Sequence, residues 1–218
     1  MKRFVVSIIG RERANAISAP YHDWVAHRRT MRRLEQLADH DLLINIGCGP
    51  NVEPGWVNVD ASRGPGIDVV WDLRQGLPFK DESASAIFGE HVIEHLPRED
   101  AQNLLKECHR VLQPGGVLRL STPDAGKYLR SYAGDGEFLR DPYFAEKIET
   151  PLDRVNLMMR EAGSHLWVYD APSLLLALKR AGFSNPQKSA FRKSSHPAMA
   201  ELDSEARAFE SLYVEATK

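Results

Sequence analysis

The chain has 218 residues, of which 43% are hydrophobic and 27% charged, and its formal net charge is −2. These values are ordinary for a globular protein and give no reason to expect a nucleic-acid partner. No apolar stretch approaches the roughly 18 residues that span a bilayer, and the two cysteines form neither a disulfide framework nor a zinc motif, so we expect no membrane partner and a reducing, cytoplasmic location.

Residues 1–40 are expected to form a helical extension in front of one larger domain, 41–218, because 21–40 places apolar side chains near one face of a helix. Apolar runs predict strands over 42–46, 56–59 and 69–70. Only a few residues rich in proline and glycine separate the first two strands, so no full helix fits between them.

The second half of the chain alternates strands and helices and is interrupted once. After a loop over 74–83, the patterns predict a strand at 84–89, a helix at 98–112 ended by the following proline and glycines, a strand at 117–121, a helix at 171–182, and strands at 187–192 and 211–216. Residues 125–165 break the alternation, with helices near 126–133 and 150–162, and are expected to be a substrate lid.

This order predicts an α/β fold, with a Rossmann-like, doubly wound, mostly parallel seven-stranded sheet and a helical insertion after strand five. The first strand ends in Gly47-Cys48-Gly49, where missing side chains let a ligand approach the backbone. Asp60 closes the second strand, where a carboxylate can accept hydrogen bonds from ribose hydroxyls. Val52 replaces a third glycine, and no helix N-terminus is expected there for a pyrophosphate. The pattern therefore favours a nucleoside cofactor without phosphates.

Several sequence blocks in order, INIGCG, LPFKDESASAIFGEHVIEHL and HRVLQPGGVLRLSTPD, resemble the class I S-adenosylmethionine-dependent methyltransferases of the small, type 11-like branch. The resemblance covers about 40–124, and 164–183 adds a further match. The general layout is also similar to sugar O-methyltransferases of polysaccharide assembly.

This resemblance implies S-adenosyl-L-methionine as the cofactor. Gly47 and Gly49 would face its methionine part, Asp60 its ribose, and Asp72 with Leu73 its adenine. Glu90 and His91 would line the boundary between cofactor and acceptor. Asn45 stands where the family often has an acidic residue, and it completes the expected cofactor set.

His91, Glu94 and His95 follow the fourth strand at spacings that share one face of a helical turn. One interpretation is structural, with Glu94 and His95 orienting each other. In a second, His91 or Glu94 takes part in catalysis as a base or as charge support. In a third, His91, Glu94 and His95, with a distant His165, hold a divalent ion such as Mg²⁺.

The metal interpretation rests on similarity to the Glu-x-x-Glu-His site of RNA 2′-O-methyltransferases and ubiquinone-pathway O-methyltransferases. Here the first glutamate is His91, which disfavours a hard cation. The same string also matches an H-x-x-E-H zinc-peptidase motif. Pro97 ends the turn too early for the long helix that such a peptidase requires.

His165 is a candidate general base, because a neutral imidazole can remove a hydroxyl proton at pH 7; the alternative is a loop residue. Asp170 is expected to be the N-cap of the next helix. The histidines favour an O-methyltransferase, and aromatic residues in the insertion suit a small saccharide acceptor: Tyr128, Tyr132, Phe138, Tyr143 and Phe144. The alternative acceptors are a quinone, a phenol or another metabolite. A further alternative is a non-catalytic cofactor-binding module. We expect either a monomer or a homodimer.

Overall fold

The computed structural model describes residues 28–134 and 148–218. The predicted N-terminal extension therefore lies mostly outside the described residues, as do Phe138, Tyr143 and Phe144. Within the described part, the end of the predicted 21–40 helix is helical over 28–35. Leu34 and Leu37 pack against the main hydrophobic core.

One seven-stranded sheet organises the molecule, with strand order β3-β2-β1-β4-β5-β7-β6. All neighbours are parallel except β7, which is antiparallel to β5 and β6. The predicted Rossmann-like, mostly parallel seven-stranded sheet is thus confirmed. The strands are β1 Leu42–Ile46, β2 Val57–Asp60, β3 Val69–Val70, β4 Ala84–Glu90, β5 Leu112–Pro123, β6 Ser184–Ser189 and β7 Ser211–Thr217.

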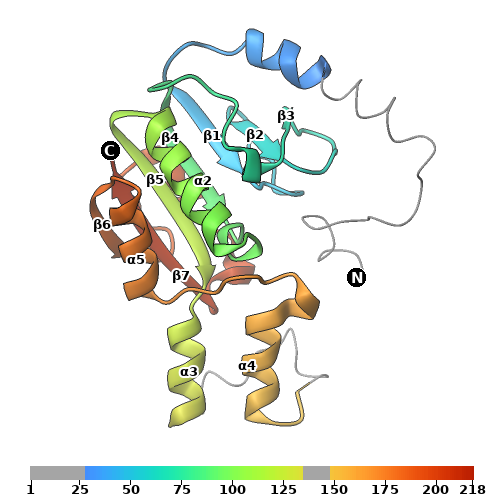
Figure 1. The fold of residues 1–218 in the computed structure, drawn as a ribbon, viewed down its shortest axis with the longest axis vertical. Coiled ribbons are helices and arrows are strands. Elements are labelled where there is room, and N and C mark those ends of the chain that lie inside the picture. Colours follow the sequence, from blue (N-terminus) through green and yellow to red (C-terminus); the bar gives the residue numbers. More distant parts are fainter. Residues whose placement is uncertain (1–27, 135–147) are drawn as a thin grey trace, which may run out of the picture.

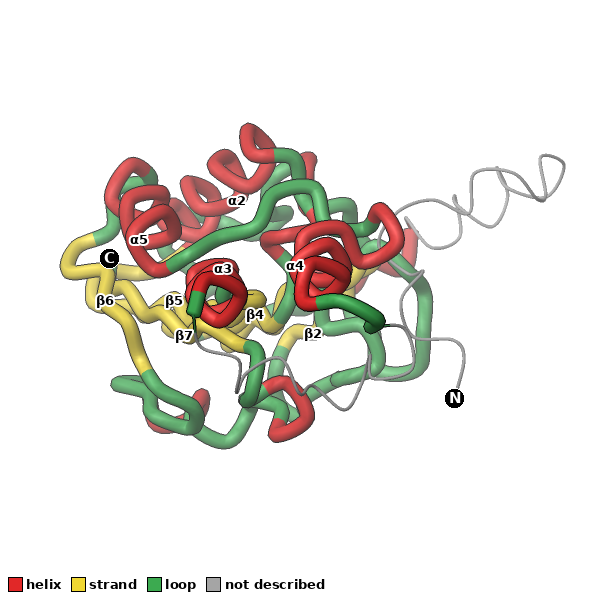
Figure 2. The backbone as a smooth tube through the Cα atoms, turned by 90° about the horizontal axis from the view of Figure 1, so that it is seen from below, coloured by secondary structure: helices red, strands yellow, loops and turns green. Residues whose placement is uncertain are grey.

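The helices α2 (Arg98–Val111) and α5 (Ala171–Arg180) lie on one face of this sheet (Figures 1 and 2). Side chains alternate between the two faces of a strand. Accordingly, Ile87 of β4 belongs to the large core under these helices, while its neighbour Phe88 joins a smaller cluster on the opposite face. The segment 190–210 contributes Met199 to that smaller cluster.

No helix separates β1 from β2 in the structure, as the sequence predicts. The connection runs through turns over 47–56, and Trp56 at its end packs edge-on against Phe88 at 6.5 Å between ring centroids. This short connection leaves the glycine turn directly at the end of β1.

The boundaries of α2 and β5 differ from the prediction. The helix ends at Val111, and β5 begins at once with Leu112, whereas we predicted a helix to 112 and a strand only over 117–121. Leu112 pairs with Ala84 and Val117 with Ala86, so a bulge accommodates the intervening residues. Gly115, at φ +80°, permits this irregular backbone.

The predicted strand over 187–192 is wrong by three residues, since β6 covers Ser184–Ser189. Asn185 and Pro186 are residue types that ordinarily interrupt a strand. In the structure β6 is an edge strand with a register shift between Ser184 and Gln187 and with Asn185 at φ +50°. An edge position tolerates proline because the missing N–H faces no partner strand.

The predicted insertion helices are present as α3 (Ala125–Ala133) and α4 (Pro151–Arg160), which lie side by side beyond the carboxyl end of β5 (Figures 1 and 2). A capping box between Thr150 and Asp153 begins α4. The left-handed residues Glu161 and Ala162 then turn the chain back toward the sheet. Among the described residues, no helix is both long and apolar enough to cross a bilayer.

Candidate active site

The glycine turn after β1 has the conformation that glycine alone adopts without strain. Gly47 and Gly49 have φ values of +61° and +52°. A Cβ at Gly47 would lie 2.4 Å from Cγ2 of Val92. The backbone N–H of Gly49 donates to Oδ2 of Asp60 at 2.9 Å, and the N–H of Ser62 donates to Oδ1 at 2.7 Å. Asp60 therefore fixes the turn while each of its oxygens keeps a free lone pair.

A pocket opens beside this turn, at the carboxyl ends of the strands. It gathers Gly47, Asp60, Asp72 and Leu73, all of which the family resemblance assigned to the cofactor. Open α/β sheets bind ligands at this edge. The remaining lining residues are Ala61, Arg74, Val92, His95, Leu96, Pro97 and Leu166.

Asp72 at the pocket wall has a partner that the sequence interpretation missed. It caps the short 3₁₀ helix Leu73–Gln75, and its carboxylate accepts from Arg74 Nε at 2.9 Å and Nη2 at 2.6 Å. Arg74 lowers the pKa of Asp72. The pair stands only two residues apart, so spacing alone could have suggested it.

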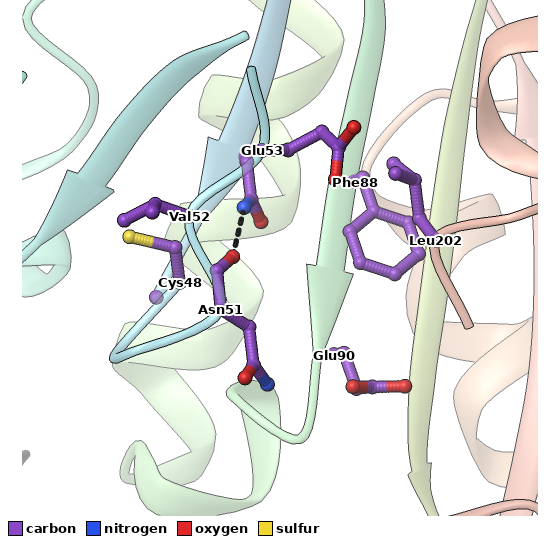
Figure 3. Close-up of a pocket in the computed structure, with 9 residues that line it drawn as sticks. Cys48, Asn51, Val52, Glu53, Phe88, Glu90 and Leu202 are labelled. Atoms are coloured by element: carbon purple, nitrogen blue, oxygen red, sulfur yellow. Dashed lines mark hydrogen bonds between the residues drawn. The ribbon is translucent and has the colours of Figure 1, made fainter. Parts of the chain in front are cut away.

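A second pocket meets the first at Gly47 and is lined by Asn45 and Glu90. Figure 3 shows the loop residues Asn51 and Glu53 on one side of it and Glu90 on the other. Asn45 is engaged within the turn, since its Nδ2 donates to Asn51 O at 3.0 Å and to Asn58 Oδ1 at 3.1 Å. Asn45 thus stabilises the turn through these two hydrogen bonds.

Glu90 faces this second pocket from the end of β4. Its Oε1 accepts the backbone N–H of Ser204 at 2.9 Å, and burial raises its pKa. Leu202 from the same segment lines the pocket. The segment 190–210 therefore forms part of the wall of this pocket. No sequence motif predicted this contribution.

His91 and Glu94 contact each other, but not in the way the spacing predicts. His91 has φ +51° and lies outside the 3₁₀ helix Ile93–His95, so the shared helical face is wrong for this residue. Its Nδ1 still lies 3.3 Å from Glu94 Oε1, and its Nε2 lies 2.7 Å from Ser211 Oγ. Because the Ser211 hydroxyl donates to Arg207 O, it accepts from His91 Nε2.

Glu94 is completely buried. Its Oε2 accepts from Thr122 Oγ1 at 3.1 Å, while Oε1 has no hydrogen-bond partner among the described residues. Burial opposes ionisation of Glu94, but His91, His95 and His165 outweigh it and lower the pKa to about 2. A buried carboxylate among three imidazoles marks this position as a functional candidate.

His165 comes to this carboxylate from the end of the insertion. The backbone N–H groups of Leu166 and Trp167 both donate to Glu94 O, at 2.8 and 3.1 Å, which holds the segment against the strand ends. The rings of His95 and His165 then lie 4.9 Å apart between centroids. The "distant" histidine of the sequence is thus next to His95.

Both ring nitrogens of His165 are occupied. Nδ1 contacts Met158 O, and Nε2 lies 2.6 Å from Glu161 Oε2. Burial opposes protonation of His165, but Glu161 and Glu94 raise its pKa. Glu161 was missed in the sequence because the predicted helix ends near 162, before His165, so no helical spacing joined the two residues.

The cluster lies between two hollows. His95 lines the first pocket, His165 lines a hollow against α4, and Leu166 contributes to both. Asp170, the expected N-cap, does cap α5 through a capping box with Ser173. Cys48 and Cys108 are both free and buried.

Comparison with known proteins identifies the region that carries this pocket. Residues 44–120 match the family model described as "Methyltransferase domain". This stretch of the chain is thus similar to a methyltransferase domain. The match confirms the class of domain that the sequence motifs predict, and it supports S-adenosylmethionine as the cofactor.

Two curated relatives resemble part of this chain. One is malonyl-[acyl-carrier protein] O-methyltransferase 1 of Coxiella burnetii, 43% identical over 70 residues, which cover 31% of this chain and 24% of the relative. The other is a probable S-adenosylmethionine-dependent methyltransferase of Mycolicibacterium smegmatis, 40% identical over 63 residues, or 29% of this chain and 24% of the relative. The match therefore spans about a quarter of each relative.

Among solved structures, phosphoethanolamine N-methyltransferase 2 of Haemonchus contortus, in complex with phosphomonomethylethanolamine and S-adenosylhomocysteine, superposes with a TM-score of 0.50. It is 14% identical, and the alignment covers 89% of this chain and 52% of that one. This likeness concerns the fold alone.

Proposed function

We propose that this protein is an S-adenosylmethionine-dependent methyltransferase that transfers a methyl group to a hydroxyl oxygen of a small acceptor. The observation that carries the proposal is the pocket that brings together Gly47, Asp60, Asp72 and Leu73. The ribose hydroxyls would bind the free lone pairs of Asp60, and the methionine part would pass over Gly47. Glu90 and Asn45 would then lie below the methionine part.

Methyl transfer from a sulfonium is an in-line displacement, so the protein mainly has to align the acceptor, exclude water and take care of its proton. Glu94, His95 and His165 lie where the cofactor pocket ends, and they would serve the acceptor hydroxyl. Because both nitrogens of His165 are occupied, we assign the proton-handling role to the cluster rather than to His165 alone. His91 would position Glu94 through its 3.3 Å contact.

An oxygen acceptor fits better than an amine, because a hydroxyl depends more on a general base to remove its proton than an amine does. The Coxiella burnetii relative is itself named an O-methyltransferase. For the acceptor class we propose a small saccharide. Trp167 beside the cluster is 42% exposed and has Arg98 over its ring at 5.1 Å, which offers an aromatic face next to a hydrogen-bond donor. Residues 125–165, with α3 and α4, would act as the lid over it.

The cofactor site is tested by calorimetry with S-adenosylhomocysteine on Asp60→Ala. We expect the affinity for S-adenosylhomocysteine to fall at least tenfold. The ribose hydroxyls lose their hydrogen-bond acceptor, and the turn loses the hydrogen bonds that Asp60 accepts from it. Asp81→Ala, at an exposed carboxylate, is the matched control and should bind as the wild type does. Unchanged affinity in Asp60→Ala would remove the proposed cofactor site.

The reaction is tested with radiolabelled S-adenosylmethionine and a panel of saccharides, phenols and quinones. A labelled saccharide supports the acceptor class, whereas a labelled phenol or quinone keeps the enzyme and overturns the saccharide. Cofactor binding without any labelled product across the panel would favour a non-catalytic binding module.

A further inference from the structure

The strongest feature that the proposed function leaves without a ligand is the group formed by Glu94, His95 and His165. One ligand atom from each lies within 4.8 Å of the others. Two of these residues are neighbours in the chain, and the third arrives from the far side of the insertion. Their meeting is a product of the fold, since the Leu166 and Trp167 N–H groups dock the His165 segment onto Glu94 O.

The second observation is an unpartnered buried oxygen. Glu94 is 0% exposed, and its Oε1 receives no hydrogen bond from any described residue. A buried carboxylate oxygen without a donor is destabilising. His91 Nδ1 lies 3.3 Å from this oxygen but completes no hydrogen bond to it. Oε1 is therefore a buried acceptor that a bound cation would satisfy.

The hydrogen bonds of His95 and His165 occupy Nδ1 in both rings, which leaves Nε2 of each as the nitrogen that could bind a metal. His95 Nδ1 donates to Ser164 O at 3.0 Å, and His165 Nδ1 donates to Met158 O. Carbonyl oxygens only accept, so Nδ1 carries the proton in both rings and Nε2 carries the lone pair of the neutral form. A backbone carbonyl that fixes the tautomer in this way is the usual support behind a metal-binding histidine.

We propose that Glu94, His95 and His165 bind one divalent transition-metal ion of the Zn²⁺ class. Two imidazoles and one carboxylate, with one position left open, form a donor set that zinc accepts. Mg²⁺, which the resemblance suggested, prefers oxygen ligands and fits this set poorly. Ligand atoms around zinc lie roughly 3.3 Å apart, so small side-chain rotations would close the group.

Binding the ion requires one exchange of partners. His165 Nε2 lies 2.6 Å from Glu161 Oε2, and it must release that carboxylate and its own proton to bind the metal. Glu161, with a side chain 14% exposed, is then free to approach the open position. An ion there would polarise an acceptor hydroxyl beside the cofactor pocket, although metal binding itself does not depend on the proposed methyl transfer.

The experiment titrates the full chain with Co²⁺ as a spectroscopic substitute for Zn²⁺, in the absence of cofactor. We expect a saturable visible absorption band at one equivalent, displaced by Zn²⁺ and not by excess Mg²⁺. His95→Gln and His165→Gln should each weaken Co²⁺ binding at least tenfold. His109→Gln is the matched control, because His109 also stacks edge-on against an aromatic ring, that of Phe183, but lies elsewhere.

Circular dichroism of each variant establishes that it is folded, and S-adenosylhomocysteine affinity establishes that the cofactor pocket is intact. Loss of the band in both site variants with cofactor affinity retained supports the metal site. A wild-type protein without a saturable band, displacement by Mg²⁺, or equal loss in His109→Gln would each overturn it. Failure of the Asp60 experiment would leave this readout untouched, so the two proposals fail separately.

Discussion

Gly47 is the residue at which backbone conformation and side-chain packing act together on the proposed cofactor pocket. Its φ of +61° disfavours any residue with a Cβ, and that Cβ would overlap Val92 Cγ2 at 2.4 Å. We expect Gly47→Ala to lower the free energy of unfolding by about 2–4 kcal/mol, the sum of left-handed strain and overpacking. Urea denaturation measures this change, and S-adenosylhomocysteine affinity should fall with it.

Gly49 supplies the control for this residue, because it has a similar φ of +52° but nothing within 4 Å of the added Cβ. Gly49→Ala should therefore lose only the conformational part, about 1–2 kcal/mol. If the two substitutions destabilise the protein equally, the contact with Val92 contributes nothing. A Gly47→Ala substitution made in a Val92→Ala background should be milder than in the wild type.

Helix α5 is an element whose start is determined by side-chain capping. Asp170 accepts the N–H of Ser173 at 2.9 Å, and the Ser173 hydroxyl oxygen accepts the N–H of Asp170 at 3.0 Å. We expect Asp170→Ala to destabilise the protein by about 1 kcal/mol. The double variant with Ser173→Ala should cost less than the sum of the two single changes, because they share one motif. Strict additivity in urea denaturation would contradict this capping box.

Elements with such local signals were predictable, and those set by distant partners were not. The Asp170 cap and the absence of a helix after Gly49 follow from nearby residues. By contrast, the bulge that begins β5 depends on pairing with Ala84 across the sheet. The left-handed His91 breaks the helical face that its spacing predicts. At the site, residue types indicated the residues of the proposed cofactor pocket, but only the fold brings His165 to Glu94.

At the scale of the whole molecule, Arg119 joins three distant parts of the chain. It lies on β5, is fully buried, and donates through Nε to Asp203 Oδ1 and through Nη1 to Glu215 Oε1 of β7, both at 2.9 Å. Its Nη1 and Nη2 also donate to Lys193 O and Ala190 O. The guanidinium thereby fastens the segment 190–210 over the sheet face that no described α-helix covers, and this segment closes the pocket at Glu90.

Removing that guanidinium should affect stability and the second pocket together. We expect Arg119→Met to destabilise the fold by about 3–5 kcal/mol at pH 7, because Asp203 and Glu215 are left as buried charges without a cation. Burial opposes ionisation of Glu215, but the serine hydrogen bonds and Arg119 lower its pKa. Its ionisation therefore stabilises the wild type above the unfolded pKa, and that contribution is lost as the pH falls through the lowered value.

In Arg119→Met the Glu215 carboxylate gains from protonation, since burial without a cation favours the neutral form. The stability difference between variant and wild type should therefore shrink as the pH is lowered from 7 to about 4. Urea denaturation at several pH values measures it, with the exposed Glu99→Gln as a control that keeps the wild-type profile. A difference that stays constant with pH would mean that Arg119 acts through packing of its side chain rather than through its charge.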